Sequence, residues 1–379
     1  MRSFEYRLYP TKRQEVQLAS CLEGCRLLYN EMLEVVKKEY EVSGKFLWNF
    51  DICTLFKGRG GDYVPQSTVQ TLADRLDKAL RTMIGYKKAG LKRGFPRFKG
   101  YLSWHSFQLR QWGKSKDAWL ADGRLRIPAK LGKSIRIKQH RLLEGIPKTC
   151  YIVKRVDKWF AVIVCDVPFQ EAPPRESSPI GIDVGLKEFL TDSNGNAVAN
   201  PKHYRKAQKK LRVQQRRAAR RTKGGKRRRK ANIQIAKTCL KTQRQRRDFH
   251  FKTAKQYADK HDVIVVEDLN VANMVKNHNL AKSITDAAWS QFLNILTQKA
   301  ESAGGSVVKV SPQYTSQMCS NCWKLVPKAL SVRTHVCPYC GLVLDRDLNA
   351  AINILQKWKD SRPGQGLQAL TLEVTPCVA

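Results

Sequence analysis

The sequence of 379 residues lacks any apolar run near the roughly 18 residues that a membrane-spanning helix needs. Its first residues, Met-Arg-Ser-Phe-Glu-Tyr-Arg, carry charges where a signal peptide has an apolar stretch. A disulfide framework is also missing, because the eleven cysteines are odd in number and most of them are scattered. We therefore expect a cytoplasmic protein with reduced thiols and no membrane partner.

Acidic residues are scarce. The chain carries 70 Lys and Arg against 32 Asp and Glu, which gives a formal net charge of +38. Such an excess repels itself unless a polyanion balances it. The composition therefore argues against a protein that acts alone on a small neutral metabolite, and it favours a nucleic-acid partner.

Residues 202–247 hold 21 Lys and Arg and contain no Asp or Glu. Because a solvated surface normally mixes both signs, we interpret this stretch as two basic helices, joined at Gly224-Gly225, that contact phosphate. The candidate contacts are Arg205, Lys209, Arg216, Arg217, Arg227, Arg228 and Arg229.

Hydrophobic periodicity divides the chain into parts. Residues 4–9 alternate like a strand, residues 11–92 show helical spacing, and short strand-like runs follow between 125 and 165. This predicts a small barrel or curved sheet, built from residues 1–10 and 93–172, with residues 11–92 inserted as helices. Prolines between 168 and 179 predict a linker, and the apolar run 262–269 predicts a central strand that is covered on both faces. We expect Asp286 to cap the helix that begins near Trp289.

Four cysteines have the spacing of a zinc site. Cys319 and Cys322 form one C-x2-C pair, and Cys337 and Cys340 form a second pair after fourteen residues. Two such turns supply the four thiolates of a tetrahedral structural zinc, whereas a redox dithiol needs only one pair. His335 is interpreted as a neighbour of this site and not as a ligand.

Three acids occupy positions that packing alone does not require. Asp183 lies inside a predicted strand, Glu267 ends the most apolar strand, and Asp347 opens a helix after the cysteine module. Each alone has an ordinary interpretation as a surface acid or, for Asp347, a helix cap. Together they suit two Mg2+ ions that stabilise both oxygens of a phosphodiester during hydrolysis.

An ordered set of motifs resembles the TnpB family of transposon-encoded proteins, relatives of compact type V CRISPR effectors. The motifs are Arg7-Leu-Tyr-Pro-Thr11, Gly94-Phe-Pro-Arg-Phe-Lys99, Gly181-Ile-Asp-Val-Gly185, Val266-Glu-Asp-Leu-Asn270, Ser311-Pro312 with Tyr314-Thr-Ser-Gln317, Leu330-Ser331 with Arg333 and His335, and Asp345-Arg-Asp-Leu-Asn-Ala-Ala351. The resemblance covers nearly the whole chain. One departure is Trp323, which follows the second cysteine where relatives often have glycine.

The resemblance implies an α/β multidomain chain. A wedge-like N-terminal β-barrel, residues 1–10 and 93–172, carries a helical recognition insertion, residues 11–92. An RNase H-like RuvC nuclease domain, residues 178–312 and 345–360, carries a zinc ribbon that binds target nucleic acid, residues 313–344. Residues 361–379 are a tail, expected to be disordered. The implied metal triad is Asp183, Glu267 and Asp347, with Asp268 and Asp345 as rivals for the last two positions.

The resemblance also implies the reaction and its partners. A guide RNA from the transposon end would recognise double-stranded DNA beside a short flanking motif, and one RuvC site would cut it. Arg97 and Lys99 are candidate nucleic-acid contacts, and Gln66, Ser67 and Gln70 are candidate readers of the flanking motif, with an ordinary surface or core role equally open. We expect one monomer per RNA, in a prokaryotic cytoplasm near the nucleoid.

Three alternatives remain open from the sequence. The chain could be a nuclease-inactive RNA-guided repressor, although the intact acidic triad argues against it. It could be a transposase that transfers strands during DNA recombination, although no dimerisation face stands out. It could be a structural RNA-binding protein, which would have no use for the three acids.

Overall fold

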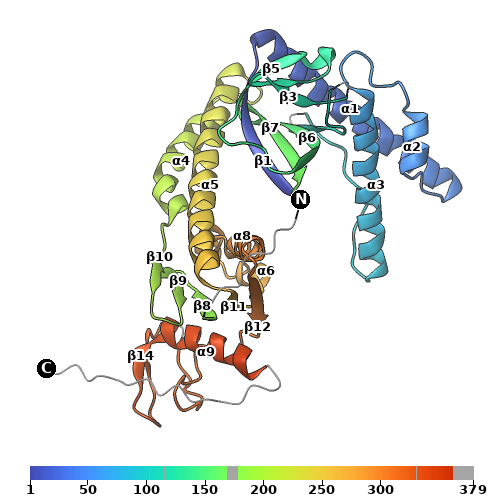
Figure 1. Ribbon diagram of the computed structural model, residues 1–379. Coiled ribbons are helices and arrows are strands. Elements are labelled where there is room, and N and C mark those ends of the chain that lie inside the picture. The colour runs from blue at the N-terminus through green and yellow to red at the C-terminus, as the bar shows by residue number, and fades with distance from the viewer. Residues whose placement is uncertain (102, 115, 169–177, 330, 362–379) are drawn as a thin grey trace. The chain divides into compact units, whose positions relative to one another are not determined.

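The computed structural model describes residues 1–101, 103–114, 116–168, 178–329 and 331–361 (Figure 1). The chain divides into two compact units, Met1–Phe169 and Gln170–Ala379. Apart from Ser361, the tail that the sequence predicts to be disordered lies outside the described residues. No helix in these ranges is both long and apolar enough to cross a membrane.

The first unit contains a seven-stranded antiparallel sheet with the order β2-β6-β7-β1-β5-β4-β3. Its strands are β1 (Arg2–Tyr9), β2 (Ser106–Leu109), β3 (Trp119–Ala121), β4 (Arg124–Arg126), β5 (Ser134–Lys138), β6 (Ile146–Arg155) and β7 (Lys158–Asp166). The pattern of residues 4–9 predicts the first strand of the chain as a member of this sheet, and the structure has it between β7 and β5. Strands β2 and β3 are at the two ends of this order, and among the described residues they do not pair with each other. The sheet is therefore open and does not close into the expected barrel.

The helices of the first unit follow β1 directly. They are α1 (Lys12–Ser43), α2 (Asn49–Leu55) and α3 (Gln66–Lys88), with the short η1 (Ala129–Leu131) among the later strands. Thr11 caps α1, because its hydroxyl accepts the Gln14 N–H while the Gln14 side chain accepts the Thr11 N–H. Cys21 and Cys25 are fully buried in the core of this unit, where they act as small apolar side chains.

The second unit contains a mixed sheet with the order β10-β9-β8-β11-β12. Its strands are β8 (Ile180–Val184), β9 (Glu188–Asp192), β10 (Ala197–Ala199), β11 (Val263–Glu267) and β12 (Ser306–Val310). Strands β8 to β10 are antiparallel neighbours, and β11 pairs in parallel with both β8 and β12. The apolar run after residue 262 therefore forms an inner strand, as predicted.

Helices cover both faces of this sheet. The helices of this unit are α4 (His203–Ala219), α5 (Lys226–Lys260), α6 (Val271–Met274), α7 (Ala281–Ala287), α8 (Trp289–Ser302) and α9 (Arg346–Asp360), and a hairpin of β13 (Thr334–Val336) and β14 (Val343–Asp345) precedes α9. Side chains of a strand alternate between faces. Ile264 and Val266 accordingly join the core with α5 and α8, whereas Val265 packs with Ile354 and Trp358 of α9. Figure 1 shows α9 on one side of the strands and α8 on the other.

Asp286 does not cap the helix at Trp289, so that prediction is wrong. It lies within α7, and its carboxylate accepts the backbone N–H groups of Tyr204 and Arg205 at 2.9–3.3 Å. It therefore caps the start of α4, where Lys202 has a left-handed φ of 48° and offers no side-chain cap. A cap supplied from another helix leaves no local sequence signal, which explains the error.

Candidate functional site

The three acids singled out in the sequence lie on the face of the second sheet that α9 covers. The register of the parallel pair ends with Val266 opposite Ile182, so Glu267 and Asp183 follow at the next position of each strand. Asp183 lies on the same face of β8 as Gly181, where a Cβ would lie 2.2 Å from the Ala351 carbonyl oxygen of α9. Glu267 lies on the same face of β11 as Val265, which packs on the same helix.

Asp347 reaches the same place from the first turn of α9. Its Oδ2 lies 4.0 Å from the position of a Cβ built on Gly185, just beyond β8. Burial raises the pKa of the Asp183 carboxyl well above its usual range, and the negative charges of Glu267 and Asp347 raise it further. The structure therefore brings the three acids together into one cluster of negative charge.

Neighbouring side chains hold two of these acids. The Thr315 hydroxyl donates to Glu267 Oε1 at 2.5 Å. Burial raises the pKa of Glu267, and the Thr315 hydrogen bond and the charge of Lys357 limit that rise. The Arg346 guanidinium lies 3.1 Å from Asp347 Oδ1, and that of Arg333 lies 3.7 Å from Oδ2. The sequence alone did not reveal the roles of Thr315 and Arg346. The position of Arg346 between Asp345 and Asp347 is a signal that could have revealed its role.

The two rival acids have other partners. Asp345 is the N-cap of α9, and its Oδ1 accepts the backbone N–H groups of Asp347 at 2.8 Å and Leu348 at 3.3 Å. Asp268 is exposed and pairs with Lys309 at 3.1 Å. Asp345 therefore caps a helix and Asp268 forms an exposed ion pair, so each rival has a structural role of its own.

Two asparagines of α9 attach the cysteine module to this site. Asn353 donates to the carbonyl oxygens of Thr315 at 2.8 Å and Met318 at 2.7 Å. Asn349 also donates to Met318 and accepts the Ser320 N–H at 3.0 Å. Both asparagine side chains are buried, so the segment leading into the first cysteine pair is fixed to the helix that carries Asp347.

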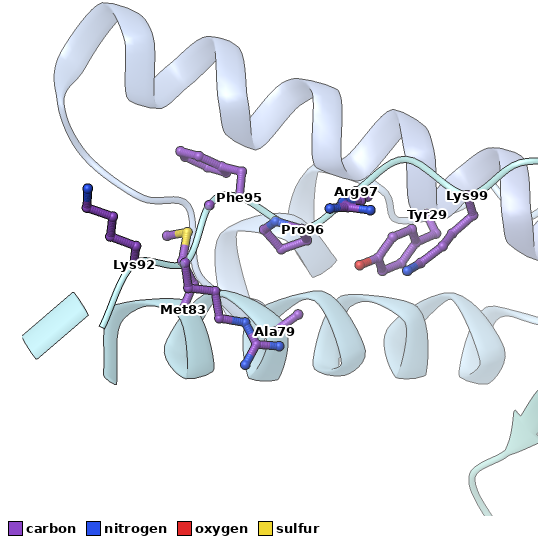
Figure 2. Close-up of a pocket in the computed structure, with 10 residues that line it drawn as sticks. Tyr29, Ala79, Met83, Lys92, Phe95, Pro96, Arg97 and Lys99 are labelled. Carbon is purple, nitrogen blue, oxygen red and sulfur yellow. The ribbon is translucent and has the colours of Figure 1, made fainter. Parts of the chain in front are cut away.

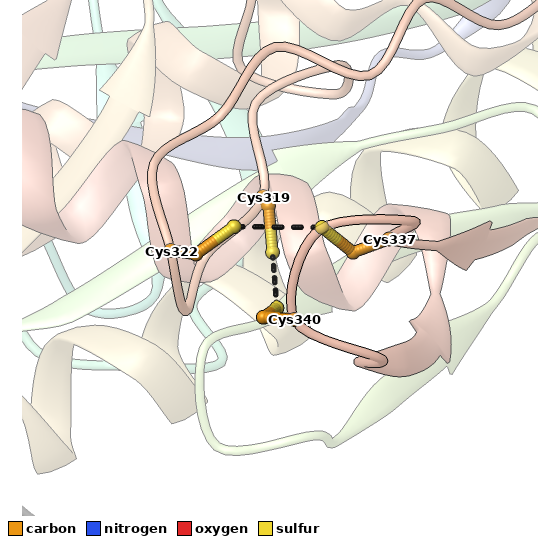
Figure 3. Close-up of side chains that lie close together, drawn as sticks. All are labelled: Cys319, Cys322, Cys337 and Cys340. Carbon is orange, nitrogen blue, oxygen red and sulfur yellow. Dashed lines mark hydrogen bonds between the residues drawn. The ribbon is translucent and has the colours of Figure 1, made fainter.

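The four cysteine sulfur atoms lie within 4.8 Å of one another (Figure 3). Sγ of Cys319 lies 3.6 Å from that of Cys340, and Sγ of Cys322 lies 3.4 Å from that of Cys337. Zn–S bonds of about 2.3 Å give a tetrahedral edge of about 3.8 Å, so this spacing suits one metal ion and is too long for disulfides. Hydrogen bonds, chiefly from the Leu342 N–H, lower the pKa of Cys340 to about 6, which favours the thiolate that binds metal.

The two turns that present these cysteines are built alike. The N–H of Gly341 donates to the Cys337 carbonyl at 3.0 Å, and the N–H of Trp323 donates to the Cys319 carbonyl at 3.0 Å. Gly341 has a φ of 76° and Trp323 a φ of 60°. Trp323 therefore takes the left-handed conformation that glycine adopts without strain, and the turn keeps its geometry.

The predicted pair of basic helices is confirmed as α4 and α5, with the turn at Gly224-Gly225. All buried residues of α5 lie from Thr242 onward, so its first half carries its cations into solvent. In the described part of the chain, no ion pair with a carboxylate involves Lys209, Arg216, Arg217 or Arg229. Arg205 donates to Ser283, and Arg228 donates to the Arg221 carbonyl. Arg227 is exposed, and its carbonyl accepts a hydrogen bond from Arg221.

The candidate readers of a DNA motif lie at the start of α3 and differ in accessibility. Gln66 is exposed and accepts the Gly58 N–H, and Gln70 is partly exposed. The Ser67 hydroxyl is buried and has no hydrogen-bond partner among the residues that the structure describes. Arg97 and Lys99 lie in the segment after α3 and line a cavity there.

Comparisons with known proteins agree over most of the chain. Residues 162–278 match the family OrfB_IS605, described as "Probable transposase", residues 289–354 match "Cas12f1-like, TNB domain", and residues 1–45 match "Helix-turn-helix domain", although here they form β1, α1 and the turn after it. A "Putative RNA-guided DNA endonuclease" of Streptomyces pristinaespiralis is 31% identical over 93% of this chain and 88% of its own length. The "TnpB-like protein L770" of Acanthamoeba polyphaga mimivirus is 25% identical over 93% of this chain and 72% of its length.

The fold is similar to that of a solved structure. The Cas12f1 chain in a complex with guide RNA and target DNA matches 90% of this chain and 82% of its own length, with a TM-score of 0.58 and 16% identity. The chain thus has a Cas12f-like α/β fold with a Cas12f1-like TNB domain. It belongs to the TnpB family.

The cysteine cluster predicts a zinc content of about one ion per chain in the purified protein. Cys337→Ser removes one thiolate, so we expect zinc to be lost and the melting temperature to fall. Cys239→Ser, at an exposed cysteine outside the cluster, is the control and should change neither. Metal analysis and thermal unfolding measure both effects, and full zinc content in Cys337→Ser would refute the site.

The left-handed backbone at Trp323 predicts that Trp323→Gly stabilises the protein by about 1 kcal/mol, because glycine adopts that conformation without strain. Gly341→Ala is the matched change in the other turn. A Cβ there meets no atom of the described residues within 4 Å, so only backbone strain should lower its stability. Denaturant unfolding of the zinc-loaded proteins measures both, and a less stable Trp323→Gly would mean that contacts of the indole outweigh the strain.

Proposed function

We propose that this protein is an RNA-guided DNA endonuclease of a transposable element. A guide RNA from the element's own end recognises double-stranded DNA beside a short flanking motif, and a single site cleaves the phosphodiester bonds. The observation that carries the proposal is the cluster of Asp183, Glu267 and Asp347 at the ends of two parallel strands and one helix. The names of the relatives and the excess of cations support the same function.

The second unit acts in this proposal as an RNase H-like RuvC domain, residues 178–312 and 345–360, interrupted by the zinc ribbon 313–344. The order of its five strands supports that assignment, because parallel pairing of β8 and β11 puts Asp183 and Glu267 at the same edge. In the first unit, the sheet strands act as the wedge domain and residues 11–92 as the recognition helices.

We propose that the acidic cluster holds two magnesium ions, because Asp183 and Glu267 are partly buried, Asp347 is buried, and bound cations would relieve the repulsion among their charges. Magnesium, when bound, stabilises the attacking and leaving oxygens of phosphodiester hydrolysis. Asp183, Glu267 and Asp347 are the proposed ligands. Thr315 orients Glu267 through its hydroxyl, and Arg346 and Arg333 balance the charge of Asp347.

Asp347 rather than Asp345 is the proposed third ligand. The carboxylate of Asp345 already caps α9, whereas that of Asp347 lies beside Gly185 and β8. Glu267 rather than Asp268 is proposed for the second position, because neighbouring residues of a strand point to opposite faces and Asp268 is exposed.

Nucleic acid binding is assigned mainly to α4 and the first half of α5, through Arg205, Lys209, Arg216, Arg217 and the run Arg227 to Arg229. Base pairing with the guide reads the sequence, while these cations grip the phosphate backbone. Gln66 and Gln70 remain candidates for reading the flanking motif. We further propose one monomer per guide RNA, acting in the cytoplasm of a prokaryotic host near the nucleoid.

Asp183→Asn should reduce guided DNA cleavage below about one thousandth of wild type, while binding of guide RNA and target stays within a few-fold. It should also raise the melting temperature when magnesium is left out. The pKa of Asp183 is higher in the folded than in the unfolded state. Ionisation of Asp183 therefore costs stability as pH rises from the unfolded-state pKa of about 3.9 through the folded-state pKa, and the gain from asparagine should vanish below about pH 3, where Asp183 is protonated in both states.

Asp345→Asn is the matched control, because asparagine also caps helices and should leave cleavage within a few-fold. If Asp347→Ala still cleaves DNA and Asp345→Asn does not, the third ligand is Asp345 and not Asp347. Cleavage by Asp183→Asn would reject the site. Target binding without any cleavage by wild type would favour the repressor, and joined DNA products would favour a strand-transferring transposase.

Changing Arg227, Arg228 and Arg229 to Gln should weaken nucleic-acid binding whatever the sequence. The dependence of log affinity on log salt should flatten by up to about 0.9 for each phosphate that the variant no longer neutralises. Lys252→Gln with Lys255→Gln, in the last part of the same helix, is the control, because these lysines already pair with Asp248 and Asp259. An unchanged slope in the arginine variant would show that its cations are only solvated.

A further inference from the structure

The first unit contains a cavity of about 540 Å³ between α1, α3 and the segment 92–99 (Figure 2). Four cations line it, namely Lys92, Arg93, Arg97 and Lys99, and no Asp or Glu of the described part of the chain is in its lining. Its volume lies in the range of pockets that hold small ligands. The cavity is therefore large enough and positive enough for an anionic ligand.

The positive charge of this cavity is not neutralised within the described residues. Lys92 and Arg97 form no ion pair there. Arg93 stacks on the Tyr86 ring at 4.6 Å, and Lys99 Nζ lies 5.6 Å from the centre of the Tyr29 ring. Contacts with aromatic rings leave the cations charged, so an anion in the cavity would gain four favourable interactions.

The segment that carries these cations is fixed at two points. At Lys99 the backbone N–H donates to Asn30 Oδ1 at 2.7 Å, and the carbonyl accepts from Asn30 at 3.0 Å and Arg26 at 2.9 Å. At the other end, Phe95 packs against Tyr40 and Phe46, with ring centres 5.5 and 5.7 Å apart. Arg97 therefore lies in a preformed segment, which lowers the entropy cost of binding.

The remaining wall is apolar. It includes Ala79 and Met83 on one turn of α3, Phe95 and Pro96 on the segment, and the buried ring of Tyr29 from α1. Figure 2 shows the Tyr29 oxygen and the Lys99 nitrogen pointing to the same side. An apolar wall beside several cations suits a ligand that joins a flat ring to a phosphate, which describes a nucleotide.

We infer that this cavity holds one unpaired nucleotide of a nucleic-acid strand, with its base against the apolar wall and its phosphate against Arg97 and its neighbouring cations. A paired base is stacked inside a duplex and cannot enter, so the occupant comes from a single-stranded or locally opened stretch. The inference rests on the proposed function, which supplies the strand. Guide RNA and the opened DNA both offer this chemistry.

Two changes separate an occupied cavity from a merely positive surface. Ala79→Leu fills part of the cavity and leaves every cation in place, and Arg97→Gln removes a cation and leaves the volume. The matched controls are Ala79→Ser, which keeps the cavity open, and Lys78→Gln, which removes an exposed cation of α3 outside the lining.

The probe is a short single strand carrying a photoreactive thio-base, prepared as RNA and as DNA and crosslinked to the full-length protein. We expect crosslinks on peptides that contain Tyr29 or residues 92–99. Their yield should fall about tenfold in both Ala79→Leu and Arg97→Gln, in keeping with the loss of one stacked base, and it should persist in the controls. The same sequence as a duplex should give no crosslink there. Crosslinks with RNA alone would assign the guide, and crosslinks with DNA alone the opened target.

Unchanged crosslinking in Ala79→Leu, or crosslinks elsewhere but none on these peptides, would overturn the inference. If Ala79→Leu has a lower melting temperature than wild type, the crosslinking yield of Arg97→Gln compared with that of Lys78→Gln tests the inference. If the wild-type protein performs guided cleavage but gives no crosslinks in the cavity, the inference about the cavity is wrong and the proposed function stands. If it gives crosslinks in the cavity but performs no guided cleavage, the proposed endonuclease function is wrong and the inference about the cavity stands.

Discussion

The close packing of α9 on β8 is the constraint on which the candidate site depends. Gly181 allows it, because any Cβ at this position would lie 2.2 Å from the Ala351 carbonyl oxygen. The helix can then start beside the ends of β8 and β11, and its first turn places Asp347 near Gly185. A larger residue at 181 would move the helix outward and take one carboxylate away from the other two. The glycine thus determines the geometry of acids that it does not touch.

The same helix couples the cysteine module to the acids. Asn349 and Asn353 hold the segment that runs from Thr315 to the first cysteine pair, and the hydroxyl of Thr315 holds Glu267. Buried amides are costly unless their hydrogen bonds are made. Metal bound at the cysteines would fix the far end of this segment, so the module has a structural route to the orientation of Glu267 without supplying a ligand itself.

The sequence was informative where its signals are local. Spacing predicted the cysteine cluster, periodicity predicted α4, α5 and the inner strand β11, and alternation separated Glu267 from Asp268. It failed where a residue acts at long range. The carboxylate of Asp286 caps α4 from 82 residues away. The cap of α9 is a separate, local case, because either of two nearby acids suits that position and the structure has Asp345 there instead of Asp347. The open pairing of the first sheet depends on register at β2 and β3, which are short strands with little pattern of their own.

The acid cluster also explains the arginines beside it. Three carboxylates that share one face repel each other, and burial strengthens the repulsion because water no longer screens it. The guanidinium groups of Arg346 and Arg333 lie 3.1 and 3.7 Å from the oxygens of Asp347, and Lys357 lowers the charge penalty at Glu267. Burial and the charges of Glu267 and Asp347 raise the pKa of Asp183 well above its usual range, and the charge of Arg346 offsets only part of that rise. A divalent cation would therefore relieve the charge on Asp183. Arginine side chains already neutralise Asp347 at the start of α9 more than Asp183 on β8. Added positive charge should therefore stabilise the fold most at β8.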